Sequence, residues 1–137
     1  MTIAISHPWA LTGSALVGSV REPRVAGFMT LANTGGPADR LVTATSPMAE
    51  KTEIHGIKVV GPGITMRPLE KGVGLPADTT ITLKPRGYHL MMWGPKMPLT
   101  KGQLVPVTLT FEKAGTREVE LVVEGEGPIG DEAMREK

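Results

Sequence analysis

Apolar and polar residues alternate with a period of two along much of this chain. That period places successive side chains on opposite faces of a strand, so it predicts half-buried β-strands. In 104–111, for example, Val105 and Val107 share one face and Thr108 lies on the other. The predicted strands span 26–33, 39–46, 51–55, 57–60, 64–68, 79–84, 104–111 and 117–123.

Turn-forming residues separate these segments. The chain has 17 glycines and 12 prolines, and it lacks a sustained helical period. In the hairpin loop 112–116, Gly115 can adopt a positive φ. These patterns predict one all-β domain over residues 1–124, an antiparallel sandwich or barrel. We expect 125–137 to be a charged, flexible tail with at most a short helix at 131–136.

Composition excludes several classes of function. The 15 basic and 14 acidic residues give a net charge of +1 without a basic stripe, so no nucleic-acid partner is expected. No apolar run approaches the roughly 20 residues of a membrane helix, so membrane insertion is not expected. Cysteine is absent, which removes disulfides and thiolate chemistry. No catalytic triad, carboxylate pair or phosphate loop stands out, so we do not expect an enzyme.

The segment 88–94, YHLMMWG, holds one of the three histidines and two of the eight methionines. If this segment is a strand, parity divides its side chains between two faces. The set expected to pack in a core is Tyr88, Leu90 and Met92. His89, Met91 and Trp93 would then share the opposite face, which places an imidazole beside a thioether.

Two upstream residues complete a candidate metal site. His55 follows Ile54, a core candidate, so its imidazole is expected on the face away from the core. Met66 lies across a Gly-Pro-Gly turn, and a hairpin there would return it to His55. The candidate ligands are His55, Met66, His89 and Met91. Such neutral, partly soft donors suit Cu(I) and are poor ligands for magnesium or calcium.

Ordinary packing is the competing interpretation. Methionine often fills gaps in a core, and a lone histidine is more often a surface or hydrogen-bonded residue than a ligand. The residues expected to be structural or exposed are His7, Met29, Met48, Met92, Met97 and Met134. The spacing His-x10-Met followed by His-x-Met is only moderately specific for a metal site.

The residues also resemble a known family, the periplasmic copper chaperones of the PCuAC type. The similar segments are 26–47, 53–56, 64–94 and 97–115. HPWA at 7–10 resembles the first, Trp-containing strand of that family. The most specific part is GYHLMM followed by PLTKGQLVPVTLTFE. The resemblance therefore covers most of the chain and not a single motif.

The resemblance implies a cupredoxin-like, antiparallel Greek-key β-sandwich with one Cu(I) site. The residues that carry the family's copper-binding pattern are His55, Met66, His89 and Met91. It also implies a periplasmic, non-enzymatic protein whose secretory signal has been removed. Its copper would pass to a receiving partner, either a cytochrome c oxidase subunit with the Cu(A) site or another copper chaperone. We expect a monomer.

The chain departs from the family pattern in places. Gly56 and Ile57 follow the first histidine, where members often carry a methionine. Trp93 lies on the predicted ligand face, where it could screen Cu(I) or block a partner. The tail has Met134 but no histidine, so no second copper site is inferred there.

Two other functions stay open at this stage. The same sandwich could be a non-metal binding module whose Met- and Trp-rich edge contacts a protein partner. A redox copper protein is the second alternative, although a blue-copper site is impossible without cysteine. Tight one-to-one binding of Cu(I) would distinguish a chaperone from the binding module. A chaperone that exchanges ligands with its partner is expected to expose some of its own.

Overall fold

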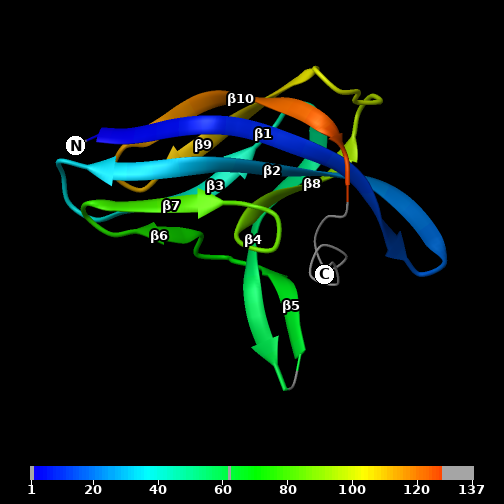
Figure 1. Ribbon diagram of the computed structural model, residues 1–137, viewed down its shortest axis with the longest axis horizontal. Coiled ribbons are helices and arrows are strands. Elements are labelled where there is room, and N and C mark those ends of the chain that lie inside the picture. The colour runs from blue at the N-terminus through cyan, green and yellow to red at the C-terminus, as the bar shows by residue number, and fades with distance from the viewer. Residues whose placement is uncertain (1, 62, 128–137) are drawn as a thin grey trace.

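The computed structural model describes residues 2–61 and 63–127, and every regular element in those ranges is a β-strand (Figure 1). The strands are β1 (Thr2–Val17), β2 (Val20–Thr34), β3 (Asp39–Thr45), β4 (Ala49–Val60), β5 (Gly63–Pro68), β6 (Val73–Leu75), β7 (Thr79–Leu83), β8 (His89–Pro95), β9 (Leu104–Phe111) and β10 (Gly115–Glu126). The predicted all-β class is confirmed. Within these ranges, no helix could span a bilayer.

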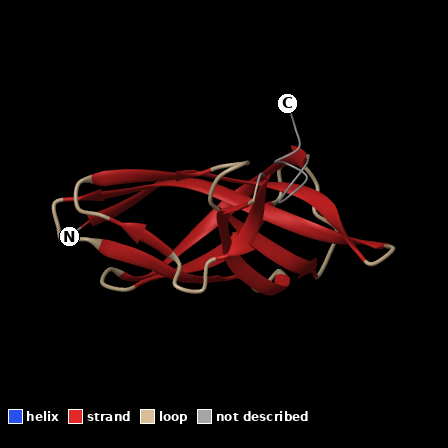
Figure 2. Ribbon diagram, turned by 90° about the horizontal axis from the view of Figure 1, so that it is seen from below, coloured by secondary structure: helices blue, strands red, loops and turns tan. Residues whose placement is uncertain are grey.

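The strands form one curled sheet in the order β5-β4-β8-β2-β1-β10-β9-β3-β6, with β7 also paired to β2. Most neighbours run antiparallel, but β1 and β10 run parallel. The sheet is therefore mixed, where the alternation predicted an antiparallel one. Its curl brings the two halves face to face, which gives the sandwich-like, cupredoxin-like shape in Figures 1 and 2.

The larger apolar cluster of the described residues, here called the main core, fills the space between the two halves of the sheet. Its side chains come from both halves. Among its members are Val25, Leu41, Ile54, Leu83, Leu90, Met92, Val107, Leu109, Phe111 and Leu121. Removing such aliphatic surface from water stabilises the fold by about 25 cal/mol per Å². The alternating positions of β9 and β10 supply one wall, as their period predicted.

The long hairpin of β1 and β2 contains a bulge that prevents β1 from showing a regular alternation in the sequence. A bulge interrupts the β1–β2 register between Ser6 and Trp9, and His7 there adopts φ 48°. The bulge reverses the strand parity, so that Ile3 and Ala10 both reach the main core. A fixed period of two therefore cannot describe this strand.

The last described strand differs slightly from the prediction. Strand β10 (Gly115–Glu126) is longer at both ends than the strand predicted at 117–123, and the Gly127 amide donates to the carbonyl of Thr12 at 3.0 Å. The helix predicted at 131–136 lies outside the described residues, as does Met134. At the predicted 112–116 hairpin, β9 and β10 pair as expected and Gly115 has φ 82°.

Candidate metal site

The two candidate histidines lie opposite each other on neighbouring strands. In the antiparallel pairing of β4 with β8, His55 is the register partner of His89. Their ring centroids are 5.6 Å apart. Because opposite residues in a sheet share a face, both imidazoles lie on the face away from the main core. Residues distant in sequence thus become direct neighbours.

Met91 joins this face, as the parity of β8 predicted. It packs with Ala26 and Phe28 in a second cluster, separate from the main core that contains Leu90 and Met92. The second cluster is flanked by three partly buried side chains, those of Trp9, Leu11 and Trp93. The structure therefore brings His55, His89 and Met91 together on one face.

The backbone of Met66 returns beside β4 through the predicted hairpin. His55 pairs with Pro68, and Ile57, two residues along β4, pairs with Met66. Figure 1 shows this β4–β5 hairpin extending away from the rest of the sheet. The Met66 side chain lies outside the described residues, so its role as a ligand stays a prediction.

The prediction that Tyr88 packs in the core is wrong. β8 begins one residue later, and Tyr88 is 41% exposed. Its carbonyl accepts a hydrogen bond from the Lys84 amide, which places Tyr88 in the preceding turn. A residue held in that turn does not follow the parity of the strand.

Hydrogen bonds determine which nitrogen of each imidazole can face a metal. His89 Nδ1 donates to the Gly87 carbonyl at 3.0 Å, so the lone pair of the neutral ring is on Nε2. His55 Nε2 donates to Glu53 Oε1 at 3.0 Å, so the lone pair of that neutral ring is on Nδ1. Metal-ligating histidines usually donate their second N–H to a backbone carbonyl or a carboxylate in this way.

Glu53 is a site residue that the sequence reasoning missed. Its second carboxylate oxygen forms an ion pair with Lys51 Nζ at 3.0 Å. Burial raises the pKa of the Glu53 carboxyl, but hydrogen bonds from His55 and Lys51 and the positive charge of Lys51 outweigh it, so the pKa lies below its ordinary value. Glu53 is therefore an ionised acceptor for His55. The spacing Glu-x-His on one strand face could have indicated this pair.

The candidate ligands are more deeply buried than the sequence led us to expect. His55, His89 and Met91 are 8%, 1% and 4% exposed. The Trp93 ring packs against His55, with ring centroids 5.3 Å apart. Trp93 thus lies on the predicted face and beside the first histidine. Without movement of a side chain, an approaching partner has little access to these ligands.

The donor set determines what such a site can hold. Among the described residues, no group of three His, Cys, Asp or Glu side chains is arranged for metal binding. Two imidazoles with a thioether instead match the preference of a soft, monovalent cation such as Cu(I).

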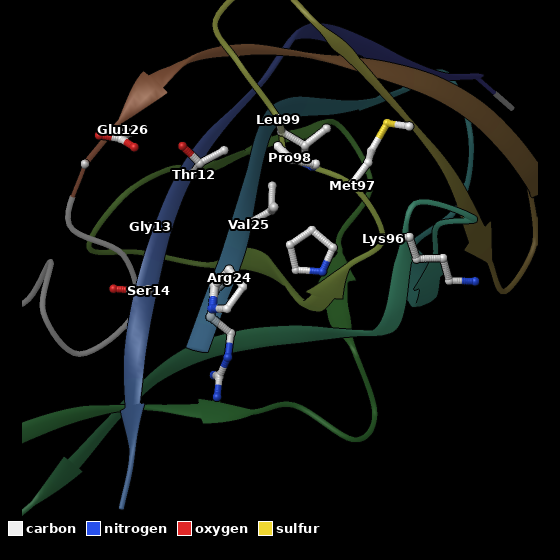
Figure 3. Close-up of a pocket in the computed structure, with 13 residues that line it drawn as sticks. Thr12, Gly13, Ser14, Arg24, Val25, Lys96, Met97, Pro98, Leu99 and Glu126 are labelled. Carbon is white, nitrogen blue, oxygen red and sulfur yellow. The ribbon is translucent and has the colours of Figure 1, made fainter. Parts of the chain in front are cut away.

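A groove lies next to this face but does not include the three described candidate ligands. It is lined by residues of β1, β2, the end of β8, the 96–99 loop and the end of β10, among them Thr12, Val25 and Leu99 (Figure 3). Arg24 also lines it, and in Figure 3 its side chain extends away from Met97 and Leu99. The Arg24 guanidinium lies over the Trp93 ring, so Arg24 connects the groove with the histidine face.

Solved structures identify the class of domain that has this fold. The copper-bound PCuAC domain from PmoF2 is 27% identical, with a TM-score of 0.68 over 90% of this chain and 92% of that one. The apo PCuAC domain from PmoF1 is 26% identical, with a TM-score of 0.71 over 90% and 93%. Cu(I)-DR1885 from Deinococcus radiodurans is 27% identical, with a TM-score of 0.59 over 92% and 80%. The chain is a PCuAC-type domain, which confirms the resemblance.

The sequence places the chain in a more particular family. The family described as "Putative lipoprotein LpqE-like" matches residues 3–123, and the chain belongs to it. The protein described as "Putative lipoprotein Lxx21020", from Leifsonia xyli subsp. xyli (strain CTCB07), is 36% identical over 98 residues. That alignment covers 72% of this chain but 59% of the relative, which is less than two thirds of its length.

Proposed function

We propose that this protein is a copper chaperone that binds one Cu(I) through His55, Met66, His89 and Met91. The observation that carries the proposal is the cross-strand histidine pair with Met91 on the same face. Each imidazole donates one N–H to an acceptor of the kind that supports metal-ligating histidines. The likeness to a copper-bound PCuAC domain supports the same conclusion.

The ligand chemistry favours the cuprous ion as cargo. Imidazole and thioether donors bring no negative charge to the metal, and thioethers prefer a soft ion. Release then requires no redox step, because a partner's ligands can replace these neutral donors one at a time. The protein acts as a carrier and not as an enzyme.

The recipient is a second copper protein outside the cytoplasm. The lipoprotein descriptions of the family and of the relative from Leifsonia xyli support an extracytoplasmic location. In this proposal the protein is periplasmic and monomeric, and it passes copper to another copper chaperone or to the Cu(A) site of cytochrome c oxidase.

Titration with Cu(I) against a competing chelator tests the proposal. The parent should bind one ion tightly, and X-ray absorption of the complex should show both nitrogen and sulfur neighbours. His55→Ala should weaken binding, whereas His7→Ala is the matched control, because His7 is exposed and lies on β1. If the parent cannot compete with the chelator for one ion, the domain is instead a non-metal binding module.

A further inference from the structure

Trp93 is held over His55 by positive charges on two sides. Its register partners are Arg24 on β2 and Lys51 on β4. The Arg24 guanidinium carbon lies 4.9 Å from a ring centroid of Trp93, and Lys51 Nζ lies 5.1 Å away. Both distances are within the range of cation–π attraction. Cross-strand neighbours thus fix the ring that packs 5.3 Å from the imidazole of His55.

The two cations are themselves constrained. Lys51 forms its ion pair with Glu53, the carboxylate that accepts from His55. Arg24 is mostly buried and lies near Glu22, at 3.8 Å. The indole, both cations and the His55 imidazole therefore form one connected group, in which a shift of Trp93 disturbs contacts on three strands.

We propose that Trp93 sets the rate at which copper enters and leaves the site, an inference that rests on the proposed function. Transfer by ligand exchange requires an incoming donor to reach the metal while the original ligands still hold it. His55, His89 and Met91 are all buried, and among the described side chains the ring of Trp93, beside that of His89, packs on His55. The ring must therefore swing away from Arg24 and Lys51 before a donor can reach the metal beside His55.

The proposal predicts that changes at Trp93 alter the rate of copper exchange more than the affinity for copper. Trp93→Leu keeps an apolar side chain but loses the aromatic face that attracts the cations, whereas Trp93→Phe keeps an aromatic ring. Losing two cation–π contacts should accelerate exchange by roughly fivefold to thirtyfold. The equilibrium affinity for Cu(I) should change much less, because the proposed donors remain.

Stopped-flow transfer of Cu(I) from the loaded protein to excess chelator measures that rate. We expect fast release from Trp93→Leu and release close to that of the parent from Trp93→Phe. Trp9→Leu is the matched control, because Trp9 packs on Phe28 at 4.5 Å within the same second cluster. Equal rates in the parent and Trp93→Leu would overturn the proposal, as would equal acceleration by Trp9→Leu.

A metal-free measurement distinguishes this inference from the proposed function. Diethyl pyrocarbonate modifies accessible imidazoles, and exposed His7 is an internal reference. Mass spectrometry of the apoprotein should show slow modification of His55 relative to His7, and faster modification of His55 in Trp93→Leu. If His55 stays slow in the variant, Trp93 is not its cover. If the parent binds no Cu(I) but His55 is modified faster in Trp93→Leu, Trp93 does cover His55 and only the proposed copper function fails.

Discussion

The two faces of β8 are equally buried but chemically different. Leu90 and Met92 enter the main core, while His89 and Met91 lie on the opposite face. All four are at most 4% exposed. One face meets the apolar side chains of the main core. The other meets imidazole, indole and, through Lys51 and Glu53, ionised groups. Burial therefore does not distinguish a packing residue from a candidate ligand, whereas strand parity does.

Leu90→Ala should give the largest effect, and it should act on stability. Leu90 is fully buried in the main core, so truncation leaves a cavity and should lower the free energy of unfolding by about 2–5 kcal/mol. Urea denaturation measures this loss. The folded variant should still bind one Cu(I), and loss of copper binding in the folded state would mean that the two faces are not independent.

Met91→Leu should instead lower copper affinity while leaving stability nearly unchanged. The change nearly conserves volume, so stability should fall by less than about 1.5 kcal/mol. Copper affinity should fall by more than about tenfold, because even outer-shell changes weaken metal sites by roughly 10–100-fold. Met92→Leu makes the same substitution one residue away on the core face, and it should retain parental affinity. Equal affinities for Met91→Leu and Met92→Leu would remove Met91 from the site.

Glu53→Gln tests whether the charged acceptor of His55 matters. The amide is similar in size but carries no charge, so Cu(I) affinity should fall by about tenfold, the lower end of the range for outer-shell partners. Titration with Cu(I) in the presence of a competing chelator measures this affinity. Glu118→Gln, the same substitution at an exposed position of β10, is the control. An unchanged affinity would show that His55 needs no carboxylate to orient it.

A change at Asp39, a buried carboxylate on β3, should give the smallest effect. Asp39 accepts backbone hydrogen bonds from Arg40, Lys113 and Ala114. Burial raises the pKa of Asp39, but these three bonds and the charge of Lys113 outweigh it and hold the pKa below its ordinary value. Asp39→Asn keeps one acceptor oxygen and loses about one hydrogen bond, so it should destabilise the fold by about 1 kcal/mol at neutral pH.

The pH dependence of that difference follows from the direction of the shift. Because the folded pKa of Asp39 is lowered, its stabilisation is complete above the unfolded pKa, about 3.9, and is lost as pH falls through the folded value. Urea unfolding of parent and Asp39→Asn should therefore converge in acid. Copper affinity near neutral pH should be the same in both proteins.

The alternation of the sequence was sufficient for the strands that keep a regular period, but not for the others. β9, β10 and the Leu90/Met92 face of β8 follow parity because each packs one side against the main core. β1 was found only through the resemblance of HPWA, because the bulge at His7 reverses its parity. β6, three residues long, is too short to show a period.

The alternation of the sequence also predicted only part of the candidate site. Parity and spacing selected His55, His89 and Met91, which the strand register brings onto one face. The position of Trp93 depends on side chains that meet across three strands, and no local pattern states that pairing. Glu53 could have been found from the Glu-x-His spacing on β4, but the sequence reasoning did not use it. Tyr88 was assigned wrongly because the turn before β8 ends one residue later than the motif suggested.

The parallel pairing of β1 with β10 has a consequence for how the chain reaches its native state. Thr12 contacts Gly125 across 113 positions of sequence, so β1 completes its pairing only when β10 is available. Such non-local topology is typical of folding in milliseconds to seconds. Until β10 pairs with it, β1 therefore has an open edge, and an unpaired strand edge of this kind favours aggregation during folding.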